Sequence, residues 1–173
     1  MSNDVYLGNP LLKKANTPIE FTQEQIEEFI LCKKDPVYFA NNYVKIVTLD
    51  HGLQTFKPYH FQEKLINNFH NHRFNICKMP RQTGKSTSAA GYLLWYAMFV
   101  PDSTILVAAH KYTGSQEIMQ RIRYAYELCP NHIRAGATSY NKGSLEFDNG
   151  SRIVSATTTE NTGRGMSISL LYC

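Results

Sequence analysis

The sequence feature that most constrains the fold lies at residues 73–87, where an apolar-leaning segment meets a tight turn and then opens a helix. Gly84, Lys85 and Ser86 supply a glycine, a cation and a hydroxyl in the order that phosphate-binding loops use. In such loops backbone N–H groups and a helix N-terminus face the anion, the lysine bridges the terminal phosphates, and the hydroxyl ligates magnesium. The usual pattern G-x-x-x-x-G-K-[ST] places its first glycine where this chain has Met79, so the motif alone is weak.

The residues on either side of the motif strengthen it. Phe74, Ile76 and Cys77 fit a short buried strand before the loop, and residues 88–98 predict a strongly apolar helix after it. A phosphate loop requires a strand, a loop and a helix in this order. The competing interpretation is a Gly-Lys-Ser turn that only starts a helix, since such tripeptides often arise by chance. The flanking pattern favours the phosphate loop.

Length and composition bound the class of protein. A chain of 173 residues suits one domain, and a hydrophobic fraction of 43% with 12% aromatic residues indicates a globular fold. The formal charge of +4 is compatible with a polyanionic partner without demonstrating one. Four scattered cysteines without a C-x-x-C pair favour reduced thiols in an intracellular setting and indicate no zinc site. Without a signal pattern or a membrane-length apolar run, we expect neither secretion nor membrane insertion.

The N-terminal part of the chain predicts an arm followed by a helix. Residues 1–20 contain several glycine, asparagine and proline residues and predict an irregular arm. Thr22, with Gln25 three positions later, has the pattern of a capping box at a helix start. The apolar residues of this helix that we expect to be buried are Ile26, Phe29 and Ile30.

Two more helices and a pair of extended segments precede the loop. Asp35 followed by Pro36 predicts a second helix start, because aspartate caps well and proline suits the first helical position. Residues 44–49 and 53–56 predict short extended segments around a turn. Residues 58–69 predict a helix that leads into the loop segment.

Near the start of this third helix stands Phe61 followed by Gln62. In many nucleotide-driven motors a glutamine just upstream of the phosphate loop reads the adenine edge, because an amide both donates and accepts hydrogen bonds. A neighbouring aromatic ring then stacks on the base. The alternative is an ordinary exposed helical glutamine beside a core phenylalanine, and the spacing alone does not separate the two.

After the loop helix, residues 104–109 form a continuous apolar run of the kind that a buried parallel strand shows. His110 and Lys111 follow at the strand end, where open α/β sheets place their ligands. Thr113 and Gln116 have the spacing of another capping box, which predicts the start of an amphipathic helix.

Residues 144–155 carry the strongest hairpin signal, because Asn149 and Gly150 predict a tight primed turn between two alternating segments. The polar loop at residues 157–165 then holds Arg164 between two glycines. Such glycines let the backbone approach a ligand closely, although a flexible surface loop has the same composition.

The last stretch, residues 168–173, is apolar and predicts a strand. A phosphate-loop hydrolase needs an acidic residue at the end of a neighbouring strand to hold magnesium. No carboxylate follows this stretch, so we expect that the sequence stops before the Walker B carboxylates. Truncation, or a gene interrupted by an intron or intein, would each produce such an end.

Together these motifs resemble the ATPase domain of the large terminase subunit of tailed bacteriophages, of the contractile-tailed myovirus type. The resemblance rests on residues 77–87, on Phe61 and Gln62 upstream, and on residues 141–150 leading to Arg164, and it covers about residues 20–173. In that family arginine and glutamine precede Gly-Lys in place of the usual first glycine, which accounts for Met79.

The resemblance implies roles for individual residues. Lys85 and Arg81 would be catalytic, with Arg81 acting as a finger that stabilises charge on the departing phosphoryl group. Ser86 would bind Mg²⁺, and His110, Lys111 and Arg164 would couple nucleotide state to movement. The residues implied to bind ATP are Phe61, Gln62, Arg81, Gln82, Thr83, Gly84, Lys85, Ser86 and Thr87.

The resemblance also implies a function and partners. The family is the motor that pumps double-stranded viral DNA into the procapsid using ATP, with the portal protein and the small terminase subunit as partners and a homo-oligomeric ring as its assembled form. Its place is the host cell cytoplasm, transiently on the procapsid. The family's separate nuclease domain has no counterpart in this sequence, so we expect the 173 residues alone to bind nucleotide weakly and to turn over little.

These observations predict an α/β fold of the P-loop NTPase (RecA/ASCE-like) class, with a parallel sheet flanked by helices. We divide the chain into an arm at residues 1–20, a helical lead-in at residues 21–57 and a P-loop ATPase core at residues 58–173. Two other functions stay open: a helicase-like nucleic-acid translocase, and a non-catalytic nucleotide-binding or assembly module.

Overall fold

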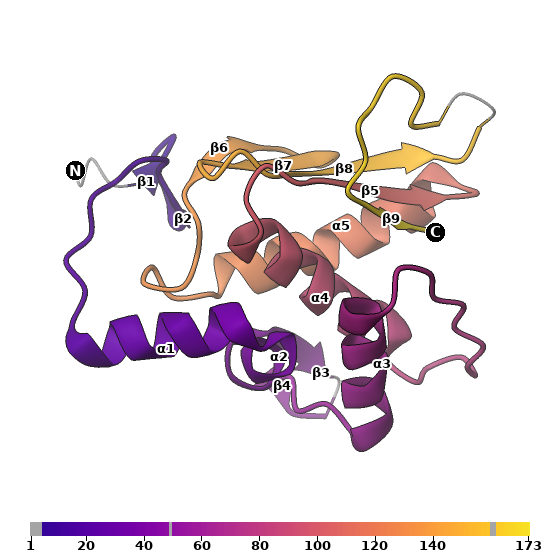
Figure 1. The fold of residues 1–173 in the computed structure, drawn as a ribbon, viewed down its shortest axis with the longest axis horizontal. Helices are drawn as coiled ribbons and strands as arrows, with labels where there is room; N and C mark the ends of the chain where they lie inside the picture. Colours follow the sequence, from indigo (N-terminus) through magenta and orange to yellow (C-terminus); the bar gives the residue numbers. More distant parts are fainter. Residues whose placement is uncertain (1–4, 49, 160–161) are drawn as a thin grey trace.

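The computed structural model describes residues 5–48, 50–159 and 162–173. Its centre is helix α4 (Lys85–Phe99), most of whose side chains are buried. Helices α2 (Pro36–Tyr43), α3 (His60–Asn71) and α5 (Tyr112–Glu127) pack against α4. The sheet forms a separate layer over α4 and α5, and the helices lie on one side of it (Figure 1). The helix expected at residues 88–98 is therefore confirmed as the core of the molecule.

The five-stranded sheet has the order β6 (Ala137–Tyr140), β7 (Ser144–Phe147), β8 (Arg152–Thr157), β5 (Thr104–Ala109) and β9 (Leu170–Tyr172). Strand β5 pairs in parallel with both β8 and β9, whereas β6, β7 and β8 pair antiparallel. The sheet is therefore mixed, which corrects the expectation of a parallel sheet. The α/β class is confirmed, and so are the strands predicted at residues 104–109 and 168–173.

The hairpin predicted at residues 144–155 is confirmed as β7 and β8, but its turn is not the expected tight primed type. Phe147 N donates to Ser151 O, so three residues lie between the paired strands, and Gly150 alone among them has a positive φ, of 81°. The Asn149 amide is used elsewhere: its Nδ2 donates to the carbonyls of Ala97 and Met98. This attachment to the end of α4 gives a physical reason for the longer turn.

The N-terminal residues form a hairpin rather than the irregular arm that was predicted. Strands β1 (Val5–Tyr6) and β2 (Asn9–Lys13) pair antiparallel. Lys13 Nζ donates to Arg134 O at 3.2 Å, and the Arg134 guanidinium donates to the Leu11 carbonyl. These reciprocal bonds hold the hairpin against the segment before β6. Residues 1–4 of the predicted arm lie outside the described residues.

Helix α1 (Gln23–Lys34) begins with the predicted capping box, in which Gln25 N donates to Thr22 Oγ1 and Thr22 N donates to Gln25 Oε1. Its predicted apolar stripe is wrong for Ile26 and Ile30, which are 42% and 43% exposed, but Phe29 packs against the core as predicted and contacts Phe99. The helix is also held near its C-terminal end, where Trp95 Nε1 donates to the carbonyl of buried Cys32.

The second helix start is also confirmed, since the Asp35 carboxylate accepts from Val37 N at the beginning of α2. The two extended segments are present as β3 (Lys45–Thr48) and β4 (Gly52–Thr55), which pair antiparallel. Leu49, in the segment predicted at residues 44–49, lies outside the described residues.

Helix α5 is amphipathic, as expected, but does not have the expected start. Its buried residues include Ile118, Met119, Ile122, Ala125 and Tyr126. It begins at Tyr112 without a side-chain cap, and Gln116 Nε2 donates to Ser155 Oγ at 2.8 Å instead of closing a capping box with Thr113. The glutamine thus ties the helix to β8.

The strand predicted at Phe74, Ile76 and Cys77 is wrong. Residues 74–80 have no regular secondary structure, and Ile76 is fully exposed. A strand needs a partner for its backbone N–H and C=O groups. Within the described residues this segment pairs with neither β6 nor β9, the two edge strands.

Candidate functional site

The candidate site is built around the first turn of α4. Gly84 is the N-cap of this helix, with a left-handed backbone (φ 74°, ψ 14°) and no side-chain cap. The first intrahelical bond runs from Ser88 N to Gly84 O, so the N–H groups of residues 85–87 have no partner inside the helix. Free N–H groups and the helix dipole together favour an anion at this point.

The lysine of the motif is held by the loop that precedes it. Lys85 Nζ donates to the carbonyl oxygens of Met79 at 2.7 Å and Pro80 at 3.2 Å. Thr83 Oγ1 donates to the same Pro80 carbonyl at 3.0 Å. The loop from residue 79 to residue 84 therefore curls around the ammonium group, which places a positive charge next to the uncapped helix N-terminus.

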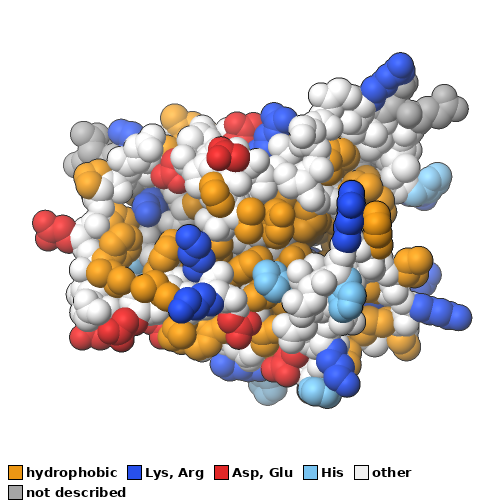
Figure 2. All heavy atoms as spheres, in the orientation of Figure 1, with side chains coloured by type: hydrophobic (Ala, Val, Ile, Leu, Met, Phe, Trp, Pro, Cys, Tyr) orange, Lys and Arg blue, Asp and Glu red, His pale blue; other side chains and the backbone are white. Residues whose placement is uncertain are grey.

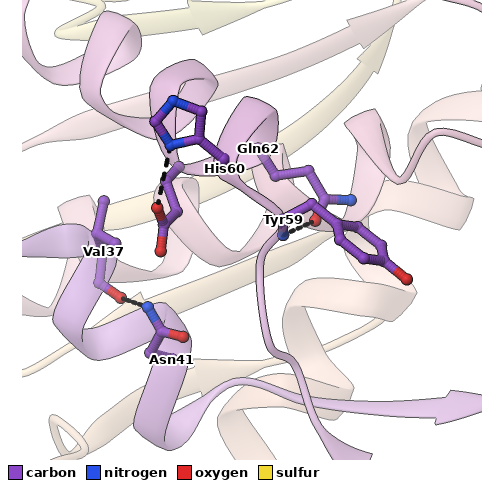
Figure 3. A network of polar contacts seen from close by, with 6 residues as sticks. Val37, Asn41, Tyr59, His60 and Gln62 are labelled. Atoms are coloured by element: carbon purple, nitrogen blue, oxygen red, sulfur yellow. Dashed lines mark hydrogen bonds and ion pairs between the residues drawn. The ribbon is translucent and has the colours of Figure 1, made fainter.

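Gln62 connects helix α3 to this loop. Its Oε1 accepts from Tyr59 N at 2.8 Å, which closes a capping box at the start of α3 (Figure 3). Its Nε2 donates to Thr83 O at 2.9 Å, and the side chain is only 4% exposed. A Cβ atom on Gly84 would collide with the Gln62 amide nitrogen. The glutamine is therefore not the ordinary exposed side chain of the alternative interpretation.

Phe61 is not a core residue either. It is 44% exposed, and its ring stacks on that of Tyr59, with centroids 5.8 Å apart and an interplanar angle of 9°. Tyr59 is itself 70% exposed. Two parallel rings thus stand at the surface beside the buried amide of Gln62, and they offer a face on which a planar ligand can stack.

The carboxyl end of β9 reaches the other side of the helix start. Burial is the main reason that the pKa of Tyr172 lies above its ordinary value, and a side-chain hydrogen bond with Ser86 acts in the opposite direction. The Cys77 thiol also contributes to raising the pKa of Tyr172. The end of β9 therefore lies near the first turn of α4 at Ser86.

The remaining predicted residues lie around this centre. Arg81 and Gln82 are exposed on the loop, and Gln82 has a left-handed backbone with φ 61°. Thr87 lines a cavity of about 430 Å³ between β3, α4 and α5, together with Val44, Ile46, Arg121 and Tyr124. No residue of the loop at 79–86 lines that cavity, so the cavity is separate from the loop.

The predicted coupling residues lie on other loops. His110 and Lys111 are exposed between the end of β5 and the start of α5, as the sequence indicated. Arg164 is exposed in the loop before β9, between two glycines with φ near 78°. On the face in Figure 2, lysine and arginine side chains are interspersed with acidic ones, so charge alone does not mark a nucleic-acid surface there.

Sequence reasoning missed two residues of the site. Tyr59 stands three positions before Gln62, which is capping-box spacing, but a tyrosine is not a usual N-cap and gave no signal. Tyr172 lies far from Ser86 in the sequence, and only the pairing of β9 with β5 brings it close.

The fold and the site together define an α/β protein with a mixed sheet whose candidate site lies at the uncapped N-terminus of its central helix. Residues 76–173, more than half of the chain, match the family described as terminase large subunit, T4likevirus-type, N-terminal. The chain belongs to this family, which gives it a role in phage DNA packaging. Proteins of the family are generally ATPases. The match begins after Phe61 and Gln62, so it does not cover the α3 side of the site.

The family match confirms the resemblance drawn from the sequence. The partners that membership implies are viral DNA and packaging components in general. Within the described ranges no helix is both long enough and apolar enough to cross a membrane.

Proposed function

We propose that this chain is the ATP-binding part of the packaging motor, and that the loop at residues 79–86 holds the triphosphate. The observation that carries the proposal is the pairing of an uncapped α4 N-terminus with Lys85 Nζ, which the Met79 and Pro80 carbonyls hold at that point. An ammonium group next to free N–H groups is the arrangement that a terminal phosphate requires.

In this proposal Lys85 exchanges its carbonyl partners for phosphate oxygens when ATP binds. Two bonds from the ammonium group to neutral carbonyl oxygens are replaced by bonds to anionic phosphate oxygens, whose charge adds a direct attraction. Arg81, exposed on the same loop, stabilises the charge on the departing phosphoryl group. Gln82, Thr83, Gly84 and Thr87 complete the loop and first turn that enclose the phosphates.

On the α3 side, the exposed Tyr59–Phe61 ring pair provides the stacking face for adenine. Gln62 connects this face to the loop through Thr83. Ring stacking contributes about 1–3 kcal/mol per base in nucleic-acid-binding proteins, so an exposed preformed pair is a substantial part of a nucleotide site.

Magnesium fits the described residues only in part. The Ser86 hydroxyl is placed to ligate an ion that also contacts the phosphates. Among the described residues no group of three histidine, cysteine, aspartate or glutamate side chains could hold a metal. Among these residues we therefore assign only Ser86 to Mg²⁺.

At the level of the whole motor, we propose ATP-dependent packaging of double-stranded DNA into the procapsid in the host cytoplasm. The portal protein, the small terminase subunit and further copies of the chain in a ring are the partners. His110, Lys111 and Arg164 couple nucleotide state to movement. The family match favours this function over a helicase-like translocase.

The test is titration of the full 173-residue chain with a fluorescent ATP analogue and Mg²⁺. Lys85→Ala is expected to weaken binding by at least about tenfold, or about 1.4 kcal/mol, because it removes the cation from the phosphate site. Lys78→Ala, which removes an exposed lysine of the neighbouring segment, is the matched control and should bind as wild type does. Equal affinity of the Lys85→Ala variant, or no binding by wild type, would contradict the proposal and favour the non-catalytic module.

A further inference from the structure

The amide of Gln62 has both ends engaged inside the protein. Its Oε1 accepts from Tyr59 N and its Nε2 donates to Thr83 O, and almost none of the side chain is exposed. An amide that reads a base must direct its donor and acceptor at the ligand. The arrangement here directs them at two backbone groups instead, the N–H of Tyr59 at the start of α3 and the carbonyl of Thr83 on the loop. Figure 3 shows the first of these two contacts.

The bond to Thr83 fixes the orientation of one peptide plane. The described peptide bonds are trans, so the Thr83 carbonyl and the Gly84 N–H point in opposite directions. Because the carbonyl points at Gln62, the Gly84 N–H is turned away from α3. A flip of this peptide would exchange the two directions and present a carbonyl oxygen where an anion-binding donor is needed.

The conformation and the small size of Gly84 both suit the contact between Gln62 and Thr83. Its left-handed φ of 74° suits glycine, and its missing side chain leaves the space that the Gln62 amide nitrogen occupies. Because glycine has no side chain to serve as a cap, the N–H groups of the first turn of α4 stay available to a ligand.

The support behind Gln62 is rigid. Leu65 and Ile66 of α3 are buried against the core, and the Tyr92 hydroxyl of α4 donates to the Phe69 carbonyl of α3. The C-terminal end of α3 is thus bonded to the middle of α4, while Gln62 near its N-terminal end is bonded to the loop. A side chain on a fixed helix can hold a loop peptide in one orientation.

We propose that Gln62 is a positioning residue for phosphate binding: it holds the Thr83–Gly84 peptide so that the N–H groups at the start of α4 face the triphosphate. This inference rests on the proposed function and gives Gln62 a role that does not involve contact with the base. Phe61 and Tyr59 then provide the base contact on their own.

The experiment compares two ligands, ATP and inorganic tripolyphosphate, each with Mg²⁺, for binding to the full chain by calorimetry. A residue that reads adenine affects ATP only, whereas a residue that positions the loop affects both. Gln62→Met keeps the length of the side chain and removes both hydrogen bonds. We expect it to weaken the binding of ATP and of tripolyphosphate by the same factor, about tenfold, because the lost bond to Thr83 no longer holds the peptide that faces the phosphates.

Two control variants separate this effect from others. Phe61→Ala removes the stacking ring and should lower the affinity for ATP while leaving the affinity for tripolyphosphate unchanged. Gln25→Met removes the same type of capping contact at the start of α1 and should leave both affinities unchanged. Gln62→Asn retains the amide but is too short to reach Thr83, so it should reproduce Gln62→Met with less disturbance of packing.

The possible results have distinct meanings. Loss of ATP affinity in Gln62→Met and Gln62→Asn with unchanged tripolyphosphate affinity would overturn the inference and make Gln62 a base reader. Unchanged affinity for both ligands would also overturn it. Failure of wild type to bind either ligand would overturn the proposed function, and the inference with it.

Discussion

Two segments of this chain look alike in the sequence and differ in the structure. Residues 104–109 and residues 74–77 are both apolar runs that predict a strand. The first is β5, which is paired on both sides and contributes Ile105 and Val107 to the core. The second is exposed and unpaired within the described residues. The comparison teaches that an apolar pattern specifies a strand only where neighbouring strands can form hydrogen bonds with its backbone N–H and C=O groups.

The comparison matters for the site because the exposed segment leads directly into the loop. The loop is held from its other end, by Gln62 at Thr83 and by the start of α4. The phosphate-facing end of the loop is therefore fixed while the preceding segment is not. Three predictions probe this difference, from the largest expected effect to the smallest.

The strongest contrast comes from Ile105→Ala and Ile76→Ala. Ile105 is fully buried, so its truncation should lower the free energy of unfolding by about 2–5 kcal/mol. Ile76 is fully exposed, so the same change should stay within about 0.5 kcal/mol. Urea denaturation followed by circular dichroism measures both. A cost at Ile76 comparable to that at Ile105 would show that the segment is buried in solution.

The next contrast compares two glycines that share a left-handed backbone. Gly165→Ala should lower the unfolding free energy by about 1–2 kcal/mol, the cost of a left-handed residue, because nothing lies near the added Cβ. Gly84→Ala should cost a further 1–3 kcal/mol or so, because the added Cβ collides with Gln62. If thermal or urea unfolding shows the same loss of unfolding free energy in the two variants, the Gln62 side chain does not pack against Gly84.

The smallest effect concerns the β9 side of the site. Burial raises the pKa of Tyr172, so the folded state disfavours its phenolate. The stabilising contribution of this group is therefore fully present below the ordinary tyrosine pKa of about 10 and is lost as the pH rises through the folded value. Tyr172→Phe should make stability fall less steeply above pH 10, as measured by urea unfolding at several alkaline pH values. An unchanged alkaline slope would place the hydroxyl in solvent.

Much of the fold could be predicted because its signals are local. Thr22 with Gln25 and Asp35 with Pro36 marked helix starts, and residues 104–109 marked β5, since capping and burial act within a few residues. The errors occur where a distant group intervenes. Gln116 binds Ser155 instead of capping α5, and the Asn149 amide binds the end of α4.

In the candidate site, too, the residues could be predicted from local sequence signals, whereas the contacts between distant elements could not. Gly84, Lys85 and Ser86 were found from adjacent positions in the sequence, and Gln62 from its position upstream. The bond from Gln62 to Thr83 and the contact of Tyr172 with Ser86 depend on how α3 and β9 pack around α4. No local pattern encodes those contacts, and they are what turns a weak motif into a defined site.

The most direct test of the central claim is a crystal structure of the chain with a non-hydrolysable ATP analogue and Mg²⁺. We predict that the triphosphate lies against the first turn of α4, and that Lys85 Nζ leaves the Met79 and Pro80 carbonyls to contact it. A nucleotide bound elsewhere, with Lys85 still on those two carbonyls, would contradict the account.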